Sequence, residues 1–141
     1  MKSLEIKSFI MAMIALCAIF VSCHRNPDKP DIGETIIGSW RWVCSYGGYG
    51  GQYIFADSVD YQKFVSLDIN SIYTEMVDDS VYYRQPYRIE KKEVWGDTAE
   101  VIIIENYPFE LIIDRVDRDT LVLNEYCNDC YTHTFVRLYP I

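Results

Sequence analysis

The residues of this chain best suited to chemistry are three cysteines and a histidine. Cys127 and Cys130 are separated by two residues, His133 follows three residues later, and Cys44 lies far upstream. Three thiolates and one imidazole are the ligand set of a closed structural zinc site. On a strand, however, Cys130 and His133 point to opposite faces, so this zinc set would need a bulge to converge. It stands as an alternative, and we predict no metal or other cofactor.

The same cysteines are suited to a disulfide. If the chain closes so that its first and last strands pair, Cys44 comes close to Cys130 or Cys127, and a bridge there would contribute about 2–4 kcal/mol. One cysteine would be left over. Redox chemistry at Cys127 and Cys130 is a weaker alternative, since reactive pairs often begin a helix and none is predicted here. The remaining alternative is that the cysteines are buried free thiols.

No pattern in the chain is typical of an enzyme. The serines at 39, 45 and 66 have only His133 as a histidine partner, which argues against a nucleophilic triad. Most acids fall in or beside predicted turns, and no spacing forces two carboxylates to face each other as in a glycosidase. Nor do acids alternate around a glycine as in an EF-hand. We therefore expect a protein without catalytic residues.

Composition restricts the class of protein further. The 141 residues include 13 Lys and Arg against 21 Asp and Glu, a formal net charge of −8, and half of them are hydrophobic. That apolar share is enough for one packed core. The acidic balance argues against nucleic acid and against an anionic membrane surface as partners, because both attract basic patches.

The first residues are predicted to be a targeting signal. Lys2 and Lys7 precede an apolar run over 9–21, which is long enough for a secretory signal and too short for a membrane-spanning helix. Small Ser22 before Cys23 resembles a bacterial lipobox. We predict a lipoprotein signal peptide over 1–22, acylated Cys23 in the bilayer of a bacterial cell envelope (periplasmic or surface-exposed), and a flexible tether over 23–34. A plain secretory signal is the alternative.

The remainder, 35–141, has the pattern of a β domain. Apolar residues alternate with polar ones along 36–46, with Trp40, Trp42, Cys44 and Tyr46 on one face. Turn signals separate eight such segments, at 36–46, 61–69, 72–77, 81–89, 101–105, 109–116, 120–126 and 131–138. Short connections favour an eight-stranded up-and-down antiparallel barrel. A two-sheet sandwich is the alternative.

Motifs on the first and last segments carry a family resemblance. Gly38-Ser39-Trp40 is similar to the Gly-x-Trp that opens lipocalin barrels, and Arg137 takes the place of an arginine that packs over that tryptophan. With Asp119-Thr120-Leu121 and Thr134-Phe135-Val136-Arg137, the chain resembles small lipocalin-like lipoproteins of Bacteroidetes-type bacteria over about 34–139. The resemblance implies a lipocalin-like barrel and no catalytic residues. Lipocalins are usually longer, so a roomy ligand cup is not expected.

Two functions stay open for such a barrel. In the first, it binds a small apolar or amphipathic ligand, with Trp42, Tyr46, Tyr49, Tyr53 and Tyr83 as candidates. In the second, bulky side chains fill it, and it is a protein–protein interaction or structural module of the envelope. The candidate inward residues are indeed bulky: Trp40, Trp42, Val65, Leu67, Tyr83, Ile103, Leu111, Ile113, Leu121, Leu123 and Phe135.

Overall fold

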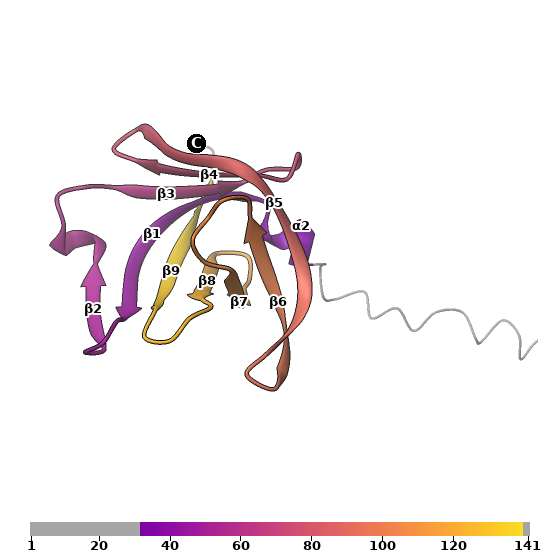
Figure 1. Ribbon diagram of the computed structural model, residues 1–141. Helices are drawn as coiled ribbons and strands as arrows, with labels where there is room; N and C mark the ends of the chain where they lie inside the picture. Colours follow the sequence, from indigo (N-terminus) through magenta and orange to yellow (C-terminus); the bar gives the residue numbers. More distant parts are fainter. Residues whose placement is uncertain (1–31, 140–141) are drawn as a thin grey trace, which may run out of the picture. The chain divides into compact units, whose positions relative to one another are not determined.

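The computed structural model describes residues 32–139, and these form a β-barrel (Figure 1). The predicted signal peptide, Cys23 and most of the predicted tether lie outside the described residues. The elements are α2 (Ile32–Ile36), β1 (Gly38–Gly47), β2 (Gln52–Phe55), the 3₁₀ turn η1 (Ala56–Ser58), β3 (Lys63–Leu67), β4 (Ile72–Val77), β5 (Ser80–Val94), β6 (Asp97–Ile104), β7 (Leu111–Val116), β8 (Thr120–Glu125) and β9 (Tyr131–Leu138). Within 32–139, no helix is long and apolar enough to cross a bilayer.

The sheet closes on itself as an up-and-down antiparallel barrel. Strands β3 to β9 pair in chain order, and β1 pairs with both β3 and β9. Eight strands therefore form the wall, which confirms the predicted barrel and is consistent with a lipocalin-like one. The sandwich alternative is wrong, because closure leaves β1 and β9 as neighbours along almost their whole lengths.

A short strand, β2, was not predicted. It pairs with the second half of β1, Cys44–Gly47, whereas β3 pairs with the first half, Gly38–Arg41. The glycine-rich turn between β1 and β2 permits this sharp reversal, since Gly48 and Gly51 adopt positive φ angles of 72° and 60°. Only four residues long and preceded by glycines, β2 carries too little alternation to be recognised from sequence.

The core lies inside the barrel and matches the predicted inward set except at one strand. Trp40, Val65, Leu121 and Phe135 are buried in it, together with Trp42, Leu67, Leu111, Ile113 and Leu123, while Tyr83 packs against it. Ile103 was predicted to face inward and instead belongs to a small outer cluster, with Ile102 and Ile104 inside. Because residues 101–104 are apolar at both parities, the sequence holds no information on which parity faces the core.

One end of the barrel is closed by α2. The buried Trp40 donates its indole N–H to the Ile36 carbonyl, 2.9 Å away, and the Arg137 guanidinium lies 4.0 Å from the Trp40 ring centroid. Arg137 also donates to the carbonyls of Ile37 at 2.8 Å, Arg118 at 2.6 Å, and Thr35. The expected arginine–tryptophan contact is confirmed, and it seals this end.

Candidate functional site

A pocket of about 240 Å³ lies at the other end of the barrel. Its walls come from β1 between Trp42 and Ser45, from β2, from the segment that leads into β3, and from the start of β9. The lining residues are Trp42, Ser45, Ile54, Tyr61, Lys63, Tyr131 and His133. The site therefore combines aromatic walls with a hydroxyl, an imidazole and an ammonium group.

A β-bulge in β1 explains why Ser45 lines this pocket. Register against β9 shifts between Trp42 and Cys44, so the alternation of inward and outward side chains reverses there. Ser45 is only 5% exposed, whereas Tyr46 is 45% exposed. Simple alternation had placed Trp42, Cys44 and Tyr46 on one face; beyond Trp42 that prediction is wrong, and it hid Ser45 as a pocket residue.

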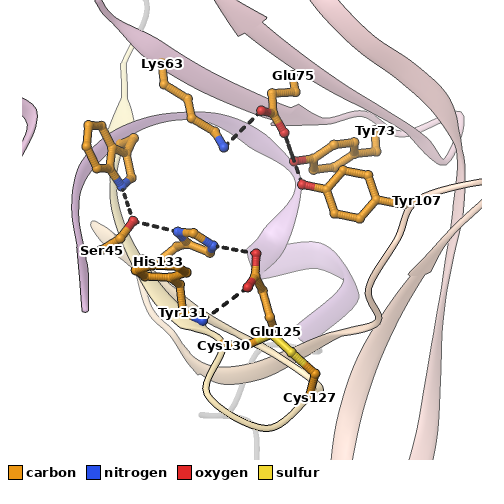
Figure 2. A network of polar contacts seen from close by, with 11 residues as sticks. Ser45, Lys63, Tyr73, Glu75, Tyr107, Glu125, Cys127, Cys130, Tyr131 and His133 are labelled. Carbon is orange, nitrogen blue, oxygen red and sulfur yellow. Dashed lines mark hydrogen bonds and ion pairs between the residues drawn. A yellow bond between two sulfur atoms is a disulfide. The ribbon is translucent and has the colours of Figure 1, made fainter. Parts of the chain in front are cut away.

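Four side chains form a continuous polar chain beside the pocket, and Figure 2 labels three of them, Ser45, His133 and Glu125. The Trp42 indole N–H donates to Ser45 Oγ at 2.9 Å, and Ser45 Oγ lies 2.7 Å from His133 Nδ1. His133 Nε2 lies 3.1 Å from Glu125 Oε1. With neutral His133 protonated on Nε2, each group donates to the next, from Trp42 through Ser45 and His133 to Glu125. The chain is fully satisfied in that one tautomer.

Serine, histidine and glutamate in this order have the connectivity of a hydrolytic triad, although sequence reasoning did not expect Ser45 and His133 to act together. Here Ser45 meets Nδ1 and the carboxylate meets Nε2, whereas serine proteases use the two nitrogens the other way round. Ser45 Oγ is also engaged by Trp42. The hydroxyl therefore has both an acceptor and a donor partner, which suits a rigid wall that holds His133 in place.

Burial and hydrogen bonding act in opposite directions on Glu125. Burial favours the neutral acid, but hydrogen bonds from His133 and from the Tyr131 backbone N–H, 3.1 Å from Oε2, favour the carboxylate. The positive charge of Lys63 acts in the same direction as the hydrogen bonds, and the net effect lowers the pKa of Glu125. Glu125 is thus held ionised behind the imidazole.

A second polar cluster surrounds Glu75, which is 5% exposed (Figure 2). Its carboxylate forms an ion pair with Lys63 Nζ at 2.9 Å and accepts the hydroxyls of Tyr73 at 3.0 Å and Tyr107 at 3.3 Å. Burial, reinforced by neighbouring charges, raises the pKa of both tyrosines, so both stay protonated donors. Glu75 thus has three donors, and Lys63 is one of them.

The barrel wall is interrupted beside this pocket. Trp42 and Val43 pair with neither β2 nor β3, because the chain between those strands loops out through η1 and Tyr61. A second pocket of about 270 Å³ lies there, lined by Arg41, Trp42, Ala56, Asp57, Tyr61, Gln62 and Lys63. The two pockets share Trp42, Tyr61 and Lys63, so these three side chains stand between them.

Of the five predicted ligand residues, only Trp42 lines the pocket. Tyr46, Tyr49 and Tyr53 lie on the β1–β2 hairpin with exposed side chains, Tyr49 being 98% exposed. Tyr83 packs edge-on against Tyr107 and donates its hydroxyl to the Glu105 carbonyl. Sequence reasoning missed Ser45, Ile54, Tyr61, Lys63 and Tyr131 as pocket residues, and considered His133 only as a zinc ligand or triad partner.

The disulfide forms between different cysteines from those predicted. A bridge from Cys44 to Cys130 or Cys127 is wrong: Cys127 is bonded to Cys130, with their Cα atoms 5.6 Å apart, and Cys44 is free. Cys44 lies opposite Thr134, whereas the Cys130 carbonyl accepts the N–H of Gly48 at 3.3 Å. Four residues along a strand span roughly 13 Å, too far for a bridge.

The alternative zinc set of Cys44, Cys127, Cys130 and His133 is not assembled. Two of its sulfurs are bonded to each other, and His133 is engaged by Ser45 and Glu125. Among residues 32–139, no group of three or more histidine, cysteine, aspartate and glutamate side chains is arranged to hold a metal ion.

Comparison with known protein families, curated proteins and solved structures finds no match to this chain.

Proposed function

We propose that this protein is a lipid-anchored, non-enzymatic lipoprotein of the bacterial cell envelope whose barrel binds a small apolar or amphipathic ligand. The observation that supports ligand binding is the pocket beside Trp42, where aromatic side chains lie next to Lys63 and His133. At about 240 Å³ it is smaller than the ~300–1,000 Å³ of sites for drug-sized molecules. The ligand is therefore a small molecule.

The anchor is supported by the sequence alone. Lys2, Lys7, the apolar run over 9–21 and Ser22 before Cys23 have the order of a lipoprotein signal. An anchor at Cys23 would join the barrel through α2, at the closed end. The pocket lies at the opposite end of the barrel from α2.

Fractionation of cells tests the anchor. We expect the wild-type chain in the membrane fraction and the Cys23→Ala variant in the soluble fraction, with the mass of the N-terminal peptide showing acyl groups only in the former. Cys17→Ala is the matched control and should remain in the membrane fraction. Equal partition of the Cys23→Ala and wild-type proteins would contradict the anchor.

Thermal unfolding tests the ligand. A ligand that binds only the folded state raises the Tm, so an organic extract of the envelope should stabilise the barrel. Ile54→Trp fills the pocket from β2 and should abolish the shift, whereas Val81→Trp, at an exposed position of β5, should retain it. A shift that survives Ile54→Trp would place the ligand elsewhere.

The second candidate function, an interaction or structural module, is favoured by the β1–β2 hairpin. Tyr46 and Tyr53 lie 4.4 Å apart between ring centroids, and Tyr53 stacks on Phe55 at 5.7 Å. All three are exposed, and such aromatic surface is typical of binding patches. A photo-cross-linking residue in place of Tyr53 should capture an envelope protein, whereas the same residue in place of the exposed Tyr82, the control, should not.

A further inference from the structure

We propose that the pocket selects amphipathic monoanions, with a flat apolar body against Trp42 and Tyr61 and an acidic group on Lys63. This inference rests on the proposed ligand-binding function and adds the chemical class of the ligand.

The aromatic walls favour a flat body. The rings of Trp42 and Tyr61 are nearly parallel, at 13°, with centroids 6.1 Å apart, and both line the pocket together with Ile54. Trp42 is held in this orientation by its hydrogen bond to Ser45. A preoriented aromatic face binds planar apolar groups with little loss of side-chain entropy on binding.

The ammonium group favours an anion. Lys63 lines both pockets, its side chain is 21% exposed, and its ammonium has three N–H donors, of which one meets Glu75. Glu75 also accepts hydrogen bonds from two tyrosine hydroxyls, so a ligand can share Lys63 without leaving the Glu75 carboxylate unpaired. Arg41 adds a second cation at the outer pocket.

The lining is cationic although the protein is acidic. Of the residues that line the two pockets, Arg41 and Lys63 are basic and Asp57 is acidic, whereas the whole chain carries a formal net charge of −8. The charged groups that a ligand meets first are therefore mostly cations, which favours an anion. A cationic ligand would face Lys63 directly, and the nearby carboxylates of Glu75 and Glu125 are already engaged by Lys63 and His133.

The carboxylates behind the lining limit the ligand to one negative charge. Glu75 is paired with Lys63, and Glu125 lies behind His133, so both are near an acidic group placed on Lys63. A monoanion shares the Lys63 ammonium with Glu75. A dianion would bring a further charge into the same space, where no unpaired cation of the inner pocket compensates it.

Four probes with one ring and different head groups test this selection: benzoate, benzyl alcohol, benzylammonium and phenyl phosphate. The unit Asp31–Ile141 contains the complete barrel and its core, and it is a compact unit by itself, so it is used for the titrations. The observable is the indole N–H resonance of Trp42, identified with Trp42→Phe. The 67% exposed Trp95 serves as an internal control.

We expect benzoate to shift the Trp42 resonance and leave that of Trp95 unchanged. One charge-assisted hydrogen bond favours benzoate over benzyl alcohol by about tenfold in Kd. Benzylammonium and phenyl phosphate should bind more weakly than benzoate. The double variant Lys63→Gln/Glu75→Gln removes the charged pair together and should bind benzoate and benzyl alcohol equally. Lys92→Gln/Glu110→Gln removes a matched outer pair and should retain the preference.

The outcomes separate this inference from the proposed function. Equal binding of all four probes, a preference for benzylammonium, or a benzoate preference that survives Lys63→Gln/Glu75→Gln would overturn the selection of monoanions while leaving a ligand site at Trp42. If no probe moves the Trp42 resonance and envelope extract also fails to raise the Tm, the ligand-binding function fails with it.

Discussion

His133 Nδ1 lies 2.7 Å from Ser45 Oγ, although the two residues are 88 positions apart in the chain. They are directly opposite each other on β9 and β1, the two strands that close the barrel. Arg137 and Trp40 are opposite each other on the same strands and meet at the closed end. The seam is thus held at one end by a cation–π contact and at the other by the polar chain beside the pocket.

Ser45→Ala should destabilise the barrel by about 1–3 kcal/mol, because it leaves the buried Trp42 N–H and His133 Nδ1 without a partner. Ser39→Ala is the matched control, since Ser39 is an exposed serine of the same strand. Its effect should stay within about 0.5 kcal/mol. Urea unfolding measures both, and equal values for the two variants would show that the polar chain does not stabilise the seam.

Arg137→Lys should cost about 2–3 kcal/mol even though it retains the charge. An ammonium group cannot donate to three carbonyls in the geometry of the guanidinium fork while also covering Trp40. Arg88→Lys, on the exposed Arg88–Glu90 pair, should change the free energy of unfolding by less than about 0.5 kcal/mol. Chemical denaturation measures the free energy of unfolding of both variants. An Arg137→Lys variant as stable as the wild type would contradict the proposal that Arg137 seals the α2 end of the barrel.

Stability should fall with acidification in a window that depends on Glu125. Its folded-state pKa lies below the ordinary value of 4.5, so its contribution is complete above pH 4.5 and is lost as pH falls through the folded pKa. Glu125→Gln should therefore be less stable than the wild type at neutral pH and show a shallower decline below pH 4.5. Exposed Glu93→Gln should keep the wild-type slope. The test is the free energy of unfolding measured from pH 3 to 7. If its slope against pH is the same for Glu125→Gln as for the wild type, Glu125 is not stabilised by His133 in the folded state.

The disulfide should contribute less than a bridge across a long loop, because it closes a very short one. For the four residues from Cys127 to Cys130, chain-entropy arguments give about 2 kcal/mol. Cys127→Ser/Cys130→Ser should lower stability by that amount, while peptide mapping of the wild type should find Cys127 linked to Cys130 and Cys44 alkylated after unfolding. A peptide linked through Cys44 would contradict the pairing.

Much of the fold is predictable because local patterns agree with it. Alternation and turn residues locate all eight wall strands, and Gly38-Ser39-Trp40 with Arg137 anticipates the contact at the closed end. The prediction fails at Ile103, because residues 101–104 are apolar on both faces of the strand. Which face of that strand points into the barrel depends on how it pairs with the neighbouring strands, and a single sequence does not contain that information.

The site was less predictable because it depends on two non-local features. The bulge after Trp42 turns Ser45 inward, and no local sequence signal distinguishes it from continued alternation. Glu75 points into the core from β4, an orientation that is stable only because Lys63 of β3 and two tyrosines meet it there. Buried charges of this kind are paired across the sheet, so they become recognisable only in the folded chain.

The central claim is that the barrel carries a small ligand in the pocket beside Trp42. Native mass spectrometry of the protein purified from the bacterial envelope tests it most directly, with wild type, Ile54→Trp and Val81→Trp measured side by side. We predict a small-molecule adduct of one per chain on the wild type and on Val81→Trp, released by organic extraction and absent from Ile54→Trp. An adduct-free wild type, or an adduct retained by Ile54→Trp, would contradict the claim.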